Sequence, residues 1–294
     1  MPDPFQLTEA TNEVASSTHP DRAVGVFDSG VGGLSVLQHI RQRLPNESLI
    51  YFADSGFAPY GEKSDEAIIE RSLTATQLLL QHQIKALVIA CNTATAAAVA
   101  TLRLRYPELI IIGIEPGLKP AALQSKSKVV GVLATRSTLQ SQKFKQLRDQ
   151  LSAETGVQFI SQACVGLVDK IEKAELQSAD TLQLVRSYVT PLLAQGADTL
   201  VLGCTHYPFV SHLINAVIAE TSATSNAVQL IDTGEAVARQ LQRLLEQHQM
   251  RHSDPALRVN TIRAWTTGDS SSLEHALQHM LGLLKEEYEV FALK

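Results

Sequence analysis

The chain has 294 residues, of which 45% are hydrophobic and 19% are charged, and its formal net charge at pH 7 is -5. A chain of this length and composition can bury one large hydrophobic core or two ordinary ones. The acidic balance disfavours a nucleic-acid backbone or an anionic membrane as the main partner, because proteins that bind either normally display a cationic surface. We therefore expect a globular protein that acts on a small soluble ligand.

The N-terminal segment differs from the rest of the chain. Residues 1–22 carry four acidic side chains and a single arginine, and they contain no apolar stretch. A secretory signal would need such a stretch, so we expect 1–22 to be a disordered extension. Apolar runs elsewhere, such as 109–114, have the length of a strand and fall well short of the roughly 20 residues that cross a bilayer. No membrane span is expected.

From Val24 onward, short apolar runs that end in small polar residues alternate with longer amphipathic stretches of helical period. This alternation is typical of an α/β fold, in which helices wrap a parallel sheet. Ser64, followed by acidic residues, is expected to cap one helix, and Pro208 suits the first turn of another. The expected strands are 24–27, 49–53, 86–90, 109–114, 129–133, 157–160, 199–202 and 228–231.

A faint internal repeat divides the chain into two halves. Segment 25–29 (GVFDS) resembles 131–135 (GVLAT), and 86–93 (ALVIACNT) resembles 198–206 (DTLVLGCTH). Each half would place one cysteine, Cys91 or Cys204, where a strand passes into a helix, and open parallel sheets bind ligands at the carboxyl ends of their strands. Chance similarity between two buried strands is the alternative, and the matching cysteines argue against it. We expect two thiols facing one cleft.

These two cysteines are candidates for chemistry. Cys91 precedes an alanine-rich helix, and we expect its pKa to be lowered, because a helix N-terminus stabilises a thiolate. Cys204 has the same context, with His206 beside it to exchange protons. An isolated cysteine is usually a small buried hydrophobe, and this is our interpretation of Cys164. The wide spacing of the three cysteines suits neither a disulfide framework nor a redox pair, which favours a reducing cytoplasm.

A glycine-rich segment, 28–33 (DSGVGG), ends the first expected strand. Its glycines allow close backbone approach, and Asp28 can accept a hydrogen bond from a substrate ammonium group. The spacing is not that of a dinucleotide-binding loop, so we expect a carboxylate ligand instead. Segment 59–61 (PYG) is by itself only a turn. Cys204 and His206 alone have poor spacing for zinc, and no metal is expected.

Four motifs in this order, 28–33 (DSGVGG), 59–61 (PYG), 90–94 (ACNTA) and 203–208 (GCTHYP), closely resemble those of the glutamate racemases. The resemblance runs from about 24 to 232. It implies two pseudo-symmetric parallel-sheet α/β domains with the active site in the cleft between them. The first domain would consist of 23–115 plus 227–294, and the second of 116–226.

The resemblance also implies roles for individual residues. Cys91 and Cys204 would be the catalytic thiols, with Asp28, Glu172 and His206 assisting them. The substrate would be held by a set of polar side chains and backbone groups from both halves: Asp28, Ser29, Tyr60, Gly61, Asn92, Thr93, Thr135, Thr138, Thr205 and His206.

Two positions fit the family pattern less closely. Glu172 resembles an acidic residue that supports the second-domain thiol, but Asp169 is a second candidate for that role. Gly117 stands where alanine is more usual. The glycine bears on the stiffness of a hinge and not on the chemistry.

The implied activity is the interconversion of L-glutamate and D-glutamate in the cytoplasm, which would supply D-glutamate for peptidoglycan. One thiolate would remove the alpha proton and one thiol would return a proton on the opposite face, with no cofactor. The extension at 1–22 resembles that of a subgroup activated by UDP-N-acetylmuramoyl-L-alanine. The resemblance leaves open a monomer or a homodimer. The alternatives are an aspartate or hydantoin racemase, or a non-catalytic regulatory binder, including a gyrase-inhibiting side role.

Overall fold

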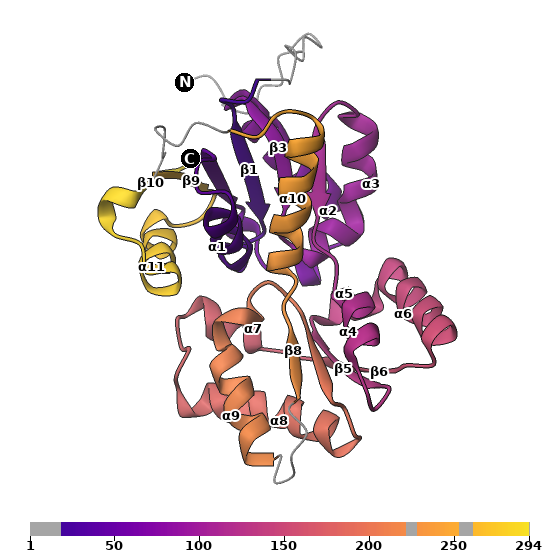
Figure 1. Ribbon diagram of the computed structural model, residues 1–294. Helices are drawn as coiled ribbons and strands as arrows, with labels where there is room; N and C mark the ends of the chain where they lie inside the picture. The colour runs from indigo at the N-terminus through magenta and orange to yellow at the C-terminus, as the bar shows by residue number, and fades with distance from the viewer. Residues whose placement is uncertain (1–18, 222–227, 253–260, 294) are drawn as a thin grey trace.

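The computed structural model describes residues 19–221, 228–252 and 261–293. Two parallel sheets form in this part of the chain, and Figure 1 shows each of them with its own set of helices. The first sheet contains β1 (Ala23–Asp28), β2 (Leu49–Ala53), β3 (Ile84–Ile89), β4 (Ile110–Gly113), β9 (Ile262–Thr266) and β10 (Tyr288–Ala292). Its strand order is β10-β9-β2-β1-β3-β4, and all neighbouring pairs are parallel.

The second sheet contains β5 (Val129–Ala134), β6 (Gln158–Ala163), β7 (Thr199–Gly203) and β8 (Gln229–Ile231). Its order, β6-β5-β7-β8, repeats the order β2-β1-β3-β4 of the first sheet, again with parallel pairs. The predicted fold class, two similar parallel-sheet α/β halves, is therefore confirmed. In both halves the cysteine of interest comes at the end of the third strand, β3 or β7.

Helices cover both faces of each sheet, which explains why the central strands are apolar along their whole length. On β1, Val24 and Val26 face one core while Ala23 and Phe27 face the other, as the two-residue period of a strand requires. The two cores of the first sheet are closed by α1 (Leu34–Arg43), α10 (Gly234–Gln247) and α11 (Ser270–Leu281) on one face, and by α2 (Asp65–Gln81) and α3 (Asn92–Arg105) on the other.

The second sheet is covered in the same way. One face packs against α7 (Leu167–Glu172), α8 (Ala179–Ala194) and α9 (Ser211–Thr221), and the other against α4 (Leu118–Gln124) and α6 (Gln142–Thr155). The short α5 (Arg136–Gln140) follows β5 directly. No helix in the residues that the structure describes is long and apolar enough to cross a membrane.

Both predicted helix starts are confirmed. The hydroxyl of Ser64 accepts a hydrogen bond from the Ala67 N–H at the start of α2. Pro208 lies in a short 3-10 helix, η3 (Tyr207–Val210), and α9 begins directly after it, at Ser211. Pro208 therefore sits in the first turn of the helical segment, where its missing N–H is not needed.

The structure differs from the sequence predictions at the C-terminal end. Strands β9 and β10 were not expected, and they extend the first sheet beyond β2. Strand β8 pairs with β7 in the second sheet, although the predicted boundary at 227 assigns it to the first domain. The chain returns to the first sheet only after Ile231, through α10, which packs beside α1 (Figure 1). The prediction that 1–22 is a disordered extension concerns mainly residues 1–18, which lie outside the described residues.

Candidate active site

The candidate residues gather where the carboxyl ends of the two sheets approach each other. The Ser35 hydroxyl at the start of α1 donates to the Thr205 carbonyl oxygen at 2.8 Å, joining the two halves directly. A Cβ atom added to Gly32 would lie 2.2 Å from His206 Nδ1, and one added to Gly30 would lie 2.5 Å from Glu172 Oε1. Gly30 and Gly32 are therefore needed because side chains from the second half approach them closely, whereas Gly33 is confined by Asp28 and Ala90 of its own half.

Cys91 follows β3 and forms the N-cap of α3, where its sulfur accepts the Ala94 N–H at 3.5 Å. Its sulfur also lies 3.4 Å from the Ser29 hydroxyl oxygen. Burial, followed by the negative charge of Asp28, raises the pKa of Cys91 to about 12, and the hydrogen bonds from Ser29 and Ala94 offset only part of this. The expected lowering of its pKa is therefore wrong for this state, because desolvation exceeds the effect of the helix N-terminus.

Asp28 ends β1 and is fully buried. Its carboxylate accepts the Gly33 N–H at 2.8 Å, and the Ser29 hydroxyl lies at 3.5 Å. Burial raises the pKa of Asp28, while the nearby His206 and the backbone N–H of Gly33 act in the opposite direction. A buried carboxylate with few donors is suited to receive a cationic group from a ligand.

On the other side of the site, Cys204, His206 and Glu172 form a chain of contacts. Cys204 Sγ lies 3.7 Å from His206 Nδ1, and His206 Nε2 lies 3.1 Å from Glu172 Oε1. Burial lowers the pKa of His206, but its contacts with Cys204 and Glu172 outweigh burial and raise this pKa well above the usual value. Burial likewise opposes ionisation of Glu172, yet the contact with His206 leaves the pKa of that carboxyl lowered. The imidazole ring of His206 is therefore held between the Glu172 carboxylate and the Cys204 sulfur, in an environment that favours its protonated form.

The same contacts separate the two acidic candidates. Glu172 reaches the second-half thiol only through His206, and it is the last residue of α7. Asp169, one turn earlier on α7, is exposed. The Glu172 side chain is itself 35% exposed, so its contact with His206, and not burial, brings it to the site in place of Asp169.

The polar candidates for substrate binding lie around these thiols. The side-chain amide of Asn92, in the first turn of α3, is buried, and neither its oxygen nor its nitrogen has a partner among the described residues. Thr93 and Thr205 are also buried. An orphaned buried amide is costly unless a ligand or water completes its hydrogen bonds. Asn92 is therefore placed to bind a ligand.

The remaining candidates come from two short segments. Thr135 caps α5, where its hydroxyl accepts the Thr138 N–H at 3.2 Å and donates to the Thr138 hydroxyl at 2.9 Å. Tyr60 begins a 3-10 helix, η2 (Tyr60–Glu62), and a Cβ on Gly61 would lie 3.8 Å from Ser137 Cβ of α5. The Tyr60 hydroxyl donates to Asp54 at 2.5 Å, so its proton is not available to a ligand.

Sequence reasoning missed Asp54, which is fully buried. Residues 54–56 (DSG) repeat the first three residues of the 28–33 segment, and both aspartates stand at the end of adjacent strands. This repeat is a signal in the sequence that could have identified Asp54.

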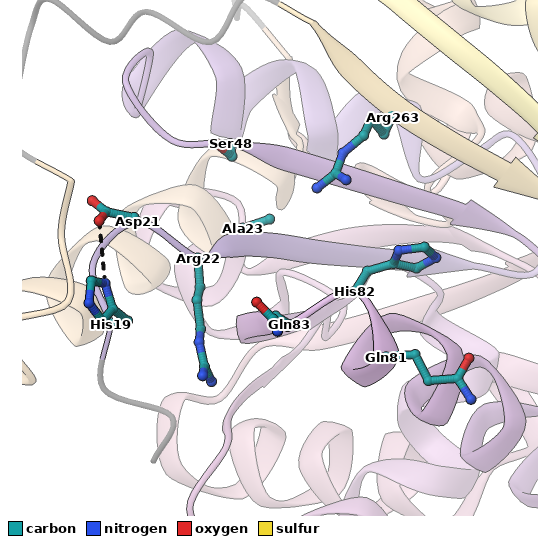
Figure 2. Close-up of a pocket in the computed structure, with 9 residues that line it drawn as sticks. All are labelled: His19, Asp21, Arg22, Ala23, Ser48, Gln81, His82, Gln83 and Arg263. Carbon is teal, nitrogen blue, oxygen red and sulfur yellow. Dashed lines mark ion pairs between the residues drawn. The ribbon is translucent and has the colours of Figure 1, made fainter. Parts of the chain in front are cut away.

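A separate hollow of about 500 Å³ lies at the opposite, amino-terminal end of the first sheet (Figure 2). None of the candidate residues lines it, and the His19–Asp21 ion pair drawn in Figure 2 stands at its rim. Ligands of open parallel sheets bind at the other end, so we do not assign the site to this hollow. Its lining residues are His19, Asp21, Arg22, Ala23, Ser48, Gln81, His82, Gln83 and Arg263.

Comparison with known proteins decides the family. The family model described as Asp/Glu/Hydantoin racemase matches residues 24–241. The chain belongs to this racemase family. A glutamate racemase of Ectopseudomonas mendocina is 55% identical over 259 residues, covering 88% of this chain and 94% of that protein.

Solved racemase structures have the same fold. The glutamate racemase isoform RacE1 from Bacillus anthracis superposes with a TM-score of 0.81 and 33% identity, covering 94% of this chain and 98% of that one. The Escherichia coli glutamate racemase, solved in complex with L-glutamate and the activator UDP-MurNAc-Ala, has a TM-score of 0.77 and 30% identity, with 92% and 98% covered.

The other two positions singled out in the sequence also have a structural account. Cys164 is buried in a core of the second half, and burial raises the pKa of its thiol to about 12. A Cβ on Gly117 would lie 2.8 Å from Ile231 Cγ2 and 3.0 Å from Thr233 Cγ2. In this racemase the glycine therefore lets the two chain segments that connect the halves pack closely together.

Proposed function

We propose that the chain is a glutamate racemase that interconverts L-glutamate and D-glutamate through Cys91 and Cys204. The observation that carries the proposal is that each similar half delivers one buried thiol to the same inter-sheet site, at equivalent positions after β3 and β7. A relative that is 55% identical over 88% of this chain is a glutamate racemase. A thiol on each side is what inversion at an alpha carbon requires.

In the proposed reaction one sulfur, as thiolate, takes the alpha proton and leaves a carbanion. The other, as thiol, donates its proton to the opposite face, so the thiolate and thiol exchange places in each turnover. By resemblance to the glutamate racemases, we assign removal of the alpha proton of L-glutamate to Cys204 and removal of the alpha proton of D-glutamate to Cys91. The imidazolium of His206, paired with Glu172, keeps a proton beside Cys204.

Asp28 links substrate binding to the state of Cys91 in this proposal. The charge of Asp28 is among the causes that raise the pKa of Cys91. A substrate ammonium group bound to Asp28 would offset that charge and lower the pKa of the thiol. The thiolate of Cys91 would then become accessible mainly when substrate is present, which protects it from side reactions.

The neutral polar groups would bind the substrate carboxylates and stabilise the carbanion through fixed hydrogen bonds in a dry site. Asn92 supports this role most directly, since its buried amide lacks any partner among the described residues. The other groups proposed for this role are Ser29, Thr93, Thr135, Thr138, Thr205 and the backbone at Tyr60 and Gly61.

The test is racemisation of L-glutamate by the purified protein in buffer that contains a reductant and has been freed of metal and pyridoxal phosphate. We expect full activity, because a thiol pair needs neither group to move a proton. Activity restored only by added zinc or pyridoxal phosphate would refute the mechanism. Aspartate and hydantoins serve as competing substrates, and binding of glutamate without turnover would favour a regulatory binder instead.

The Escherichia coli enzyme, solved with an activator, supports a second part of the proposal. We expect UDP-N-acetylmuramoyl-L-alanine to activate this chain too, linking D-glutamate supply to peptidoglycan synthesis. An activator must bind the competent state more tightly than the other state. Titration of this nucleotide into the assay tests the idea, and unchanged rates at saturation refute it.

A further inference from the structure

The segment between β2 and α2 carries two proposed substrate-binding residues, Tyr60 and Gly61, yet it has little regular structure of its own. It consists of two short 3-10 helices, η1 (Ser55–Phe57) and η2. The charge of Cys91 is among the causes that raise the pKa of Tyr60, after burial and Asp54, so the segment lies near the first thiol. Something outside the segment must hold it in place.

The carboxylate of Asp54 is the common anchor. It accepts four hydrogen bonds: from the Tyr60 hydroxyl at 2.5 Å, from Arg71 Nε at 2.9 Å, from Arg71 Nη2 at 2.7 Å and from the Thr267 hydroxyl at 2.8 Å. Two carboxylate oxygens offer about four acceptor positions in all. Asp54 therefore has no capacity left for a substrate, and its role is to position other groups.

Thr267 ties the segment to the C-terminal part of the chain. Its hydroxyl donates to Asp54 and accepts the Gly56 N–H at 3.0 Å. A Cβ on Gly56 would lie 2.5 Å from the Thr267 carbonyl oxygen, so the two backbones are in close contact. Thr267 follows β9, and it lies beyond the residues 24–241 that the family model matches.

We infer that Thr267, acting through Asp54 and Gly56, is a positioning residue for glutamate binding. The inference rests on the proposed function. Because the Tyr60 hydroxyl is bonded to Asp54, the segment can offer a substrate its backbone and not that hydroxyl. Correct placement of the backbone at Tyr60 and Gly61 then depends on a hydroxyl that lies directly after β9. Arg71 completes the anchor from α2.

The test is Thr267→Val, which keeps the shape of the side chain and removes its hydroxyl. A displaced binding segment weakens substrate and transition state alike, so KM for glutamate should rise about tenfold while kcat changes less than about threefold. Thr76→Val is the matched control: the Thr76 hydroxyl is buried in α2 and donates to the Ser72 carbonyl oxygen, away from Asp54. It should leave both constants unchanged.

Hydrogen exchange supplies a readout that does not depend on activity. The Gly56 amide and residues 55–62 should exchange faster in Thr267→Val than in Thr76→Val, without a matching change in global stability. Tyr60→Phe acts on the same carboxylate, so its effect on KM should not add fully to that of Thr267→Val.

Three results would overturn the inference: an unchanged KM in Thr267→Val, a loss confined to kcat, or unaltered exchange at Gly56. Failure of the unmodified protein to racemise glutamate is a different outcome. It would refute the proposed function and with it the role in glutamate binding, while the exchange measurement would still decide whether Thr267 holds the segment.

Discussion

Replacing Asp28 with asparagine should lower the pKa of Cys91. The Ser29 hydroxyl oxygen lies 3.5 Å from Asp28 Oδ1 and 3.4 Å from Cys91 Sγ, so the two charges are no more than about 7 Å apart. At an effective dielectric constant of about 20, two like charges at this distance repel by about 2 kcal/mol. Removing one of them should lower the pKa of the thiol by about 1.5.

The change can be measured by alkylation of Cys91 in a background that carries Cys164→Ala and Cys204→Ala. With a pKa of about 12, only about one molecule in a thousand holds the thiolate at pH 9. Asp28→Asn should therefore speed alkylation at pH 9 about thirtyfold. Ser29→Ala is the control of opposite sign, because the Ser29 hydrogen bond lowers this pKa. An alkylation rate in Asp28→Asn within threefold of the background would show that the charge of Asp28 does not govern Cys91.

Three further outcomes are expected. Cys91→Ala and Cys204→Ala should each abolish racemisation in both directions. In deuterated water Cys91→Ala should retain slow alpha-hydrogen exchange only on L-glutamate, and Cys204→Ala only on D-glutamate. Near-normal turnover in either variant would exclude the two-thiol mechanism. The contact with His206 lowers the pKa of Glu172. The ionised Glu172 carboxylate therefore stabilises the folded protein at pH values above the ordinary glutamate pKa, and this stabilisation is lost as the pH falls through the lowered pKa. The difference in Tm between the unmodified protein and Glu172→Gln should accordingly shrink on acidification below about pH 4, and a constant difference would contradict the ion pair. Cys164→Ala should cost about 1 kcal/mol in denaturant unfolding and leave turnover intact, whereas loss of turnover would give this buried thiol a role in the chemistry.

Most of the strands that the sequence predicts are buried along their length, although β6 and β8, which were also predicted, are partly exposed. The buried strands read as continuous apolar runs, as β2 and β3 do, and their positions follow from composition alone. Strand β9 interrupts its buried residues with the exposed Arg263, and β10, at the edge of the first sheet, is mostly exposed, so neither is a continuous apolar run. The placement of β8 in the second sheet depends on pairing with β7, which is not visible in its three residues.

The site could be predicted in part for similar reasons. Motifs locate Cys91 and Cys204, because the order of strand, small polar residues and helix is local in the sequence. The pKa of Cys91 is not local, since burial and Asp28 arise only when several strands and helices assemble. The role of Thr267 could not be predicted from the sequence either, because its contact with Asp54 joins residues 213 positions apart.

The two halves share one strand order, but the residues around their thiols differ, and this difference affects the kinetics of the proposed reaction. L-glutamate and D-glutamate are enantiomers with equal free energy in water, so the equilibrium constant of their interconversion is unity. The Haldane relationship then requires kcat/KM to be the same in the two directions. The halves of this chain differ in detail, with an aspartate and a serine near one thiol and a histidine and a glutamate near the other. These differences can change kcat and KM separately for each enantiomer, but they cannot make kcat/KM larger for one enantiomer than for the other.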